Sequence, residues 1–384
     1  MWKKAFPVFT AVAFLLLANG VLTTAVPLRL KLAGLSAEAI VALAAAGNAG
    51  GLLGIVMALP IVRRVGCRLS VVGFIGVFAA GSALLLSPAG PLLYDIARFA
   101  TGAALSSLYL LIESRLNGFA TPGARKRLLS TYMIVFYVAQ ALGACLGGIE
   151  PGGSSVTIIT IAALLLANTG FRGFSPAPPM VISSGRAPVI GLLRLSPGGY
   201  ALGFASGVLL GSFYALGALF AEATLSDPSL TGPFMAAAMI GGVGGLLAIS
   251  AISGNHAENV IAIAVSVASC VAALLLAILP ALIPNDMTVL LLAALFGLFG
   301  FSLYPLASVC VNSAASELTL IDANALFIFI AASGGIAGPL VAGSLIDFVG
   351  PGAAFWVIAT ATLGAAIFHA AWARSRSALS PATG

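Results

Sequence analysis

The stretch GAALSSLYLLIESRLN at residues 102–117 matches the stretch GLFGFSLYPLASVCVN at residues 297–312, an offset of 195. The two stretches share Gly, Ser, Leu, Tyr, Leu and Asn at corresponding positions, where chance would give about one or two matches. A second pair, GNAGGLLGI at 47–55 and GGVGGLLAI at 241–249, matches at an offset of 194. Both pairs run in the same direction along the chain, so the sequence predicts a parallel duplication into two halves.

The composition places both halves in a membrane. Of the 384 residues, 60% are hydrophobic and 7% are charged, and the mean hydropathy is +1.13. A soluble domain carries about a quarter charged residues, so these values exclude a soluble enzyme, a disordered protein and a nucleic-acid binder. The chain is therefore expected to be an all-α integral membrane protein.

Apolar segments long enough to cross a bilayer follow one another along the whole chain. A span needs about 20 apolar residues, and twelve such segments are bounded by charged residues or by Gly and Pro clusters. They lie near residues 6–27, 38–61, 69–88, 91–116, 128–149, 155–172, 199–221, 232–253, 259–282, 287–314, 322–346 and 351–373. The first apolar run continues past the core of about 7–15 residues that is typical of a cleaved signal, so we interpret it as a span.

The basic residues predict the orientation of these spans. Fourteen lysines and arginines flank the spans on one side, only Arg29 and Lys31 lie on the other, and Arg98 is inside a span. Basic residues favour the cytoplasmic side, so both termini are expected in the cytoplasm.

A polar segment divides the spans six and six. Residues 173–198 hold five prolines and four serines, which is typical of a linker. We therefore expect an N-terminal six-helix bundle at 1–172, a cytoplasmic linker at 173–198 and a C-terminal six-helix bundle at 199–384. Within the linker, residues 189–195 are either a short amphipathic helix or part of a plain tether.

Several short motifs point to one family. The loop after the second span reads LPIVRRVGCR (59–68), the fourth span has Arg98 and Gly102 in the spacing R-x-x-x-G, and the fifth ends GACLGG (143–148). These resemble the loop motif G-x-L-a-D-R-x-G-R-K, the R-x-x-x-G motif and the exporter motif G-P-x-x-G-G of the major facilitator superfamily. Arg63 stands where the loop motif has Asp, and the fifth span lacks the proline. IESRLN (112–117) is similar to the ESWLN of a poorly characterised bacterial branch.

The resemblance implies two parallel six-helix halves around a central cavity lined by the first, fourth, seventh and tenth spans, with alternating access to the two sides. The fourth span supports such a cavity independently. At about 100° per residue, nearly every polar group of this span falls in one stripe about 80° wide. The stripe holds Asp95, Arg98, Gly102, Ser106, Tyr109 and Glu113. Because charged groups are costly in hydrocarbon, the stripe must face protein or water.

Arg98 and Asp95 lie one turn apart on this stripe and allow two interpretations. They form a structural ion pair, or Asp95 carries a proton and Arg98 meets an anionic substrate. Glu113 is about 22 Å further along the helix. We expect it to gate the inner side by pairing with Arg64 and Arg68; a proton-coupling role is the alternative.

Other polar side chains are candidates for substrate binding. Tyr109 and Tyr304 are repeat mates near mid-depth. The remaining substrate-binding candidates are Asn19, Thr23, Asn48 and Asn312, and further cavity candidates are Tyr132, Tyr137, Gln140 and Tyr214. Glu222 and Asp227, at the outer end of the seventh span, are expected to be solvated.

Together these features predict a secondary active transporter of the inner membrane that moves a small organic solute by alternating access, with proton-coupled export favoured. The alternatives are an anion or zwitterion facilitator or symporter that uses Arg98, and a non-transporting membrane sensor with the facilitator fold. No nucleotide-binding fingerprint, metal cluster or catalytic cluster occurs, so we expect neither an enzyme nor a cofactor. The expected partners are the substrate, protons and the lipid bilayer, and the expected state is a monomer.

Overall fold

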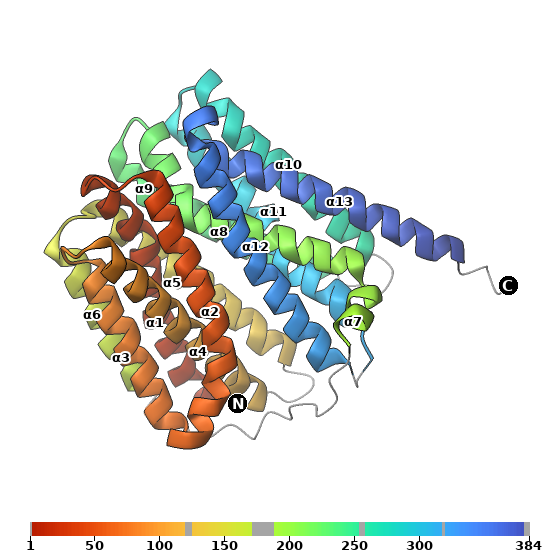
Figure 1. Cartoon of the computed structure of the whole chain (residues 1–384), viewed down its shortest axis with the longest axis horizontal. Helices are drawn as coiled ribbons and strands as arrows, with labels where there is room; N and C mark the ends of the chain where they lie inside the picture. Colours follow the sequence, from red (N-terminus) through yellow and green to blue (C-terminus); the bar gives the residue numbers. More distant parts are fainter. Residues whose placement is uncertain (1, 120–124, 171–187, 253–257, 317–318, 380–384) are drawn as a thin grey trace.

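The computed structural model describes all residues except 1, 120–124, 171–187, 253–257, 317–318 and 380–384. The secondary structure of the described residues consists of thirteen α-helices and one 3-10 turn. Figure 1 shows the helices in two groups, with α2 and α12 side by side where the groups meet. We call α1–α6 the amino-terminal bundle and α8–α13 the carboxy-terminal bundle.

The helices begin and end within a few residues of the predicted spans. In the amino-terminal bundle they are α1 (Trp2–Leu32), α2 (Ala37–Val65), α3 (Cys67–Leu85), α4 (Pro91–Phe119), α5 (Arg125–Ile149) and α6 (Ser154–Gly170). In the carboxy-terminal bundle they are α8 (Pro197–Thr224), η1 (Pro228–Leu230), α9 (Thr231–Ile252), α10 (Glu258–Leu282), α11 (Asp286–Asn312), α12 (Leu320–Val349) and α13 (Ala353–Leu379).

The predicted linker contains a short helix. Helix α7 (Val189–Leu195) coincides with the segment for which the sequence allowed either an amphipathic helix or a tether. Residues 173–187 of the linker lie outside the described residues. Because α7 is counted, the predicted seventh to twelfth spans are α8 to α13.

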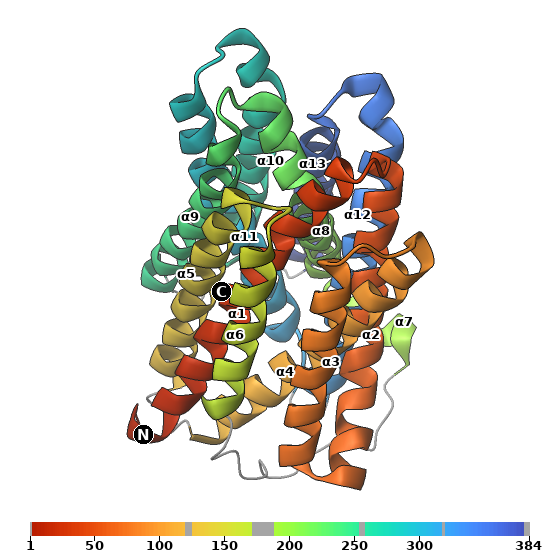
Figure 2. The ribbon, with the colours of Figure 1, turned by 90° about the vertical axis from the view of Figure 1, so that its left-hand side faces the viewer.

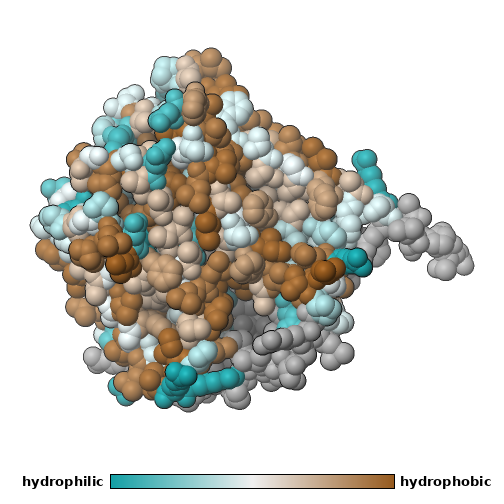
Figure 3. All heavy atoms as spheres, viewed as in Figure 1, coloured by the Kyte–Doolittle hydropathy of each residue, from teal (hydrophilic) through white to brown (hydrophobic). Residues whose placement is uncertain are grey.

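Eleven of the described helices are long and apolar enough to cross a membrane. The predicted span that is missing from these eleven is the sixth, α6, whose 17 residues make about 26 Å of helix, shorter than a hydrocarbon core of about 30 Å. The prediction extended this span to residue 172, beyond the described residues. Hydrophobic residues cover most of the face in Figure 3, as lipid-facing helices require.

A single glycine makes the tight junction between α2 and α3. Val65 ends α2 and Cys67 begins α3, so the chain reverses at Gly66, whose φ is 86°. This left-handed conformation favours glycine because a Cβ atom would be strained there. The glycine of the loop motif therefore brings the exposed Arg64 and Arg68 to one end of the bundle.

Glycines also allow paired helices to pack backbone to backbone. A Cβ atom on Gly54 of α2 would overlap the carbonyl oxygen of Ala103 in α4, and a Cβ on Gly245 of α9 would overlap that of Leu298 in α11. Such close approach is typical of membrane helices. The two contacts are equivalent, with Ala103 and Leu298 at the predicted offset of 195.

The same contacts correct the second repeat match. Gly54 and Gly245 differ by 191, so α2 corresponds to α9 at an offset of 191 and not at the 194 given by the sequence match. Small and apolar residues recur every three or four positions on these helices, and an alignment of them can therefore slip by one turn.

Helices α1 and α5 repeat as α8 and α12 in the same way. A Cβ atom on Gly20 would overlap the carbonyl oxygen of Gln140, and a Cβ on Gly211 would overlap that of Gly335. The offsets are again 191 for the first helix and 195 for the second. The offset is therefore 191 for α1 and α2 and 195 for α4 and α5. These two offsets assign each residue of the four helices a repeat mate in the other bundle.

The bundles meet most closely at the end where α1 and α8 finish, which we call the Lys31 end. The main contacts between bundles join α5 to α9 and α2 to α12, and these pairs also lie together in Figure 2. Lys31 and Glu222 form an ion pair across the junction, which corrects the expectation that Glu222 is solvated. They are repeat mates at an offset of 191, so opposite charges face each other across the pseudo-symmetric junction.

Other contacts between the bundles lie near mid-depth, where Asn48 donates to the carbonyl oxygen of Gly335 and the ring of Tyr137 stacks on that of Phe301. Glu113, toward the opposite end of α4, is exposed. The ion pair thus joins the bundles at the Lys31 end, while Glu113 toward the opposite end of α4 is open to solvent.

Candidate functional site

A cavity with two adjoining lobes lies between the bundles. The first lobe, of about 280 Å³, is lined mainly by α1, α2, α4 and α5, and the second, of about 230 Å³, mainly by α8 and α12. We call them the amino-terminal lobe and the carboxy-terminal lobe. Both are lined by Ala44, Asn48, Arg98, Tyr214 and Ala332.

Most of the predicted polar stripe of α4 faces this cavity. Arg98, Gly102, Ser106 and Tyr109 all line the amino-terminal lobe. This outcome agrees with the expectation that the stripe avoids hydrocarbon. Asp95, at the start of the stripe, is exposed and lies outside the cavity lining.

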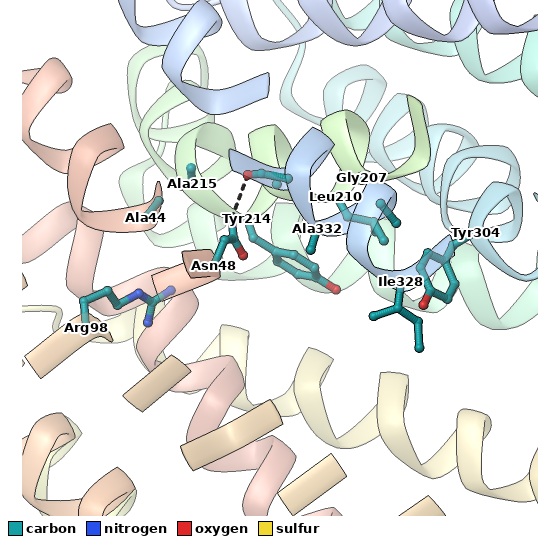
Figure 4. Close-up of a pocket in the computed structure, with 13 residues that line it drawn as sticks. Ala44, Asn48, Arg98, Gly207, Leu210, Tyr214, Ala215, Tyr304, Ile328 and Ala332 are labelled. Atoms are coloured by element: carbon teal, nitrogen blue, oxygen red, sulfur yellow. Dashed lines mark hydrogen bonds between the residues drawn. The ribbon is translucent and has the colours of Figure 1, made fainter. Parts of the chain in front are cut away.

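Arg98 forms no ion pair with Asp95, contrary to the structural interpretation of this pair. Within the described part of the chain, the guanidinium has no ion-pair or hydrogen-bond partner. Figure 4 shows its side chain extending toward Asn48 at the junction of the two lobes. A cation without a partner inside a protein is costly, so Arg98 is available to an anion in the cavity.

Gly47 makes room for this arginine. A Cβ atom on Gly47 would lie 3.0 Å from Nε and 3.1 Å from Cγ of Arg98. These contacts are tighter than ordinary van der Waals packing. The absence of a side chain at position 47 thus allows the arginine to lie along α2.

Two polar contacts cross between the bundles beside Arg98. Asn48 donates from Nδ2 to the carbonyl oxygen of Gly335 at 2.6 Å, which is the dashed line in Figure 4. Tyr214 of α8 is hydrogen-bonded to Gln140 of α5. Both contacts must change if the bundles move relative to each other.

Of the remaining substrate-binding candidates, the cavity brings together all but one. Asn19, Thr23 and Tyr109 line the amino-terminal lobe, and Tyr304 lines the carboxy-terminal lobe. Asn312 lies outside both linings and donates from Nδ2 to Ser308 Oγ on its own helix at 3.2 Å. Asn312 therefore does not face the cavity in this conformation.

Glu113 does not form the predicted inner gate in this conformation. No ion pair joins it to Arg64 or Arg68 among the described residues, and it is instead hydrogen-bonded to the buried Tyr132 of α5. The carboxylate also lies within electrostatic range of Tyr304. A carboxylate beside tyrosine hydroxyls, with access to solvent, is placed to exchange a proton.

The structure adds residues that the motifs did not single out. Gly47 is important through the space it leaves, which no composition signal reveals. Lys31 and Glu222 carry opposite charges at the ends of two spans, a signal that becomes visible once these spans are aligned as repeats. Gln140, a further cavity candidate, lines the amino-terminal lobe, and its buried Oε1 has no hydrogen-bond partner among the described residues.

Comparisons with known proteins agree with this architecture. No protein-family model matches the chain. The chain is 26% identical over 265 residues to an uncharacterized MFS-type transporter of Yersinia pestis (strain Pestoides F), a match that covers 65% of this chain and 64% of that protein. It therefore spans just under two thirds of that relative. An uncharacterized MFS-type transporter of Enterobacter sp. (strain 638) is 26% identical over 356 residues, 90% of each chain.

Solved transporter structures share the fold. A mutant of the nucleoside transporter NupG superposes with a TM-score of 0.75 at 15% identity and covers 97% of this chain and 99% of its own. A D-xylose-proton symporter gives a TM-score of 0.75 at 12% identity, with 96% and 97% covered. The MFS-type transporter relatives and this shared fold support membership of the major facilitator superfamily.

Proposed function

We propose that the chain is a secondary active transporter that moves a small organic anion or zwitterion through the central cavity by alternating access. The observation that carries this proposal is the unpaired Arg98 guanidinium at the junction of both lobes. Arginine binds carboxylates and phosphates through paired N–H donors. No carboxylate of the residues described in the structure lines either lobe, so in this proposal the substrate supplies the anion.

Alternating access follows from the two ends of the molecule. The Lys31 end is held by the Lys31–Glu222 ion pair and by backbone packing, in which a Cβ atom on Gly148 would lie 2.7 Å from the nitrogen of Gly232. In the transport cycle these contacts separate and the Glu113 end closes. This movement is possible because each bundle moves as a packed unit. The proposed inner gate of Glu113 with Arg64 and Arg68 forms in that second state.

Binding measurements on Arg98 variants test the substrate class. Purified protein is screened for thermal stabilisation by carboxylates, phosphates and zwitterions, and hits are measured in wild type, Arg98→Gln and Arg98→Lys. We expect the Gln variant to lose binding and the Lys variant to retain part of it, because lysine keeps the charge but not the paired donors. Arg194→Gln, on the exposed face of α7, is the matched control. Equal binding by wild type and Arg98→Gln would refute the proposal.

A second proposal, proton-coupled export, rests on Glu113. Its carboxylate is exposed yet hydrogen-bonded to Tyr132, and the fifth helix resembles the exporter motif. Proteoliposomes given a pH jump should transport substrate against its gradient in wild type and not in Glu113→Gln. Glu38→Gln, at the exposed start of α2, is the control. Transport that ignores the pH gradient excludes proton coupling, and absence of any transport favours the sensor alternative.

The remaining assignments are also proposals. We propose twelve spans with α6 as the sixth, both termini in the cytoplasm, a location in the inner membrane and a monomer. We propose that the chain divides into an N-terminal six-helix bundle at 1–172, a linker at 173–198 and a C-terminal six-helix bundle at 199–384. We also propose, from the motif IESRLN, that the chain belongs to the branch with the ESWLN motif. Labelling of single cysteines placed in successive loops by a membrane-impermeant maleimide tests the topology, because alternate loops must react from opposite sides.

A further inference from the structure

The polar groups of the cavity are distributed unequally between the two bundles. The repeat offsets of 191 and 195 assign each cavity residue of the amino-terminal bundle a mate in the other bundle. Asn19, Thr23, Arg98 and Gln140 have as mates Leu210, Tyr214, Ala293 and Gly335. Three of the four positions thus lose their polar side chain, and the cavity has a polar wall and an apolar wall.

The polar wall offers acceptors as well as donors. Asn19 is 8% exposed and its amide has no hydrogen-bond partner among the described residues. Gln140 is 2% exposed, and its Oε1 is likewise without a partner; neighbouring protein atoms cover this oxygen, so the amide must turn for it to reach the cavity. Both side chains line the same lobe as the unpaired Arg98.

A simple carboxylate cannot satisfy this wall. It would accept hydrogen bonds from Arg98 and from the amide N–H groups, but it has no proton to donate to the amide oxygens. A buried acceptor that stays empty loses about 1–3 kcal/mol. The wall is therefore complementary to an acid that also carries a hydroxyl or a protonated amine.

The opposite wall is suited to an apolar group. The carboxy-terminal lobe is lined by Leu210, Ile328, Ala331 and Ala332, with Gly207 and Gly211 on α8, and its polar side chains on α8 and α11 are the tyrosines Tyr214 and Tyr304. Figure 4 shows Leu210, Ile328 and Ala332 around the space beyond Asn48. An aliphatic or aromatic tail placed there loses contact with water, while the acid stays at Arg98.

Resting on the proposed function, we infer that the substrate is a small amphipathic organic acid with a hydroxyl or ammonium group near its carboxylate and an apolar tail. The acid binds Arg98, the donor group binds the amide oxygen of Asn19 and, once its side chain turns, that of Gln140, and the tail lies in the carboxy-terminal lobe. The 2-hydroxy acids and the 2-amino acids with apolar side chains share this chemistry.

Matched acids that differ in one group test the inference. Dissociation constants are measured by calorimetry on the full-length protein in detergent for phenylacetate, mandelate and phenylglycine, and for 4-methylpentanoate, 2-hydroxy-4-methylpentanoate and leucine. Acetate, glycolate and glycine are the tail-free set. In at least one tailed set we expect the hydroxy or the amino acid to bind about 5- to 100-fold more tightly than its parent acid. The tail-free set should bind more weakly.

Variants of Asn19 and Gln140 test whether their amides cause the tighter binding of the donor-bearing acid. Gln140→Leu and Asn19→Leu should each reduce the advantage of the donor-bearing acid while the parent acid keeps its affinity. Asn19→Asp separates the two sources of the donor, because a carboxylate favours an ammonium group over a hydroxyl. Thr160→Val is the control, since Thr160 is buried and donates to its own helix at Val156 O, 2.7 Å away. A thermal melt of each variant verifies folding.

The outcomes separate the inference from the function on which it rests. If parent and donor-bearing acids bind equally in wild type and depend on Arg98, the inference is overturned and the anion transporter remains. If the donor advantage survives in both leucine variants, the amides are not its source and the inference is overturned too. If no acid binds in any set, both the inference and the Arg98 proposal are overturned.

Discussion

Two adjacent glycines on α9 give opposite predictions in the two repeat registers. The sequence match at offset 194 pairs Gly244 with Gly50, whose Cβ would overlap the carbonyl oxygen of Phe99, and so predicts that Gly244 is indispensable. The structural offset of 191 instead pairs Gly245 with Gly54. In that register Gly245 is the indispensable glycine.

The size of the effect follows from what an added Cβ would meet. On Gly245 it would overlap the carbonyl oxygen of Leu298, which is backbone and cannot move aside unless α9 and α11 separate. Overpacking costs about 1–3 kcal/mol. On Gly244 the nearest atom is Cδ1 of Leu298 at 3.1 Å, the flexible end of a side chain, and the higher helix propensity of Ala, worth about 1 kcal/mol, offsets this contact.

Thermal unfolding of the detergent-purified variants measures the difference. We expect Gly245→Ala and Gly54→Ala to lower Tm by roughly 2–12 °C, at about 2–4 °C per kcal/mol for a unit of this size. Gly244→Ala should stay within about 2 °C of wild type. Gly73→Ala is the control, because nothing lies within 4 Å of an added Cβ there. An equal loss of Tm for Gly244→Ala and Gly245→Ala would refute the structural register.

Two further predictions concern the outer surfaces of the protein. Lys31→Glu should speed maleimide labelling of a cysteine placed at the buried Val41 by about twofold, because a partly exposed ion pair contributes about 0.5 kcal/mol. Adding Glu222→Lys to this variant should restore the wild-type labelling rate. If the double variant shows no recovery, a direct ion pair is contradicted. Hydrogen bonds from Ser229 lower the pKa of the Asp227 carboxyl, which accepts from the Ser229 backbone nitrogen at 2.9 Å. Because the pKa of Asp227 is lower in the folded state than in the unfolded state, the ionised carboxylate stabilises the folded protein at neutral pH. This stabilisation is lost as the pH falls through the folded-state pKa. The Tm difference between wild type and Asp227→Asn should therefore shrink toward pH 3, and a constant difference would show that the charge is irrelevant.

Helix positions were predictable because crossing a membrane imposes a strong local requirement. Each span must be apolar over about 20 residues and must satisfy its backbone hydrogen bonds internally. The ends of α4, α10 and α11 therefore fall within about three residues of the apolar segments. The direction of the polar stripe on α4 was predictable for the same reason, since Arg98 and Tyr109 share a face by helix geometry alone.

Side-chain partners were not predictable in the same way. Asp95 is one turn from Arg98, but its side chain is exposed and the pair does not form. Glu113 is hydrogen-bonded to Tyr132 of the neighbouring α5 and is not paired with the loop arginines. In both cases the sequence gives the separation along one helix, while the partner depends on which other helix lies alongside.

The sequence by itself determined a membrane-embedded duplicated chain, its helices and the stripe of α4 that avoids lipid, because hydropathy and helix periodicity act locally along the chain. Tertiary structure alone decided the register of the repeat, the Lys31–Glu222 junction and the unpaired state of Arg98 beside Gly47. These features depend on distances between helices that are far apart in sequence. Backbone contact at glycines sets those distances, and a difference of one helical turn changes every partner.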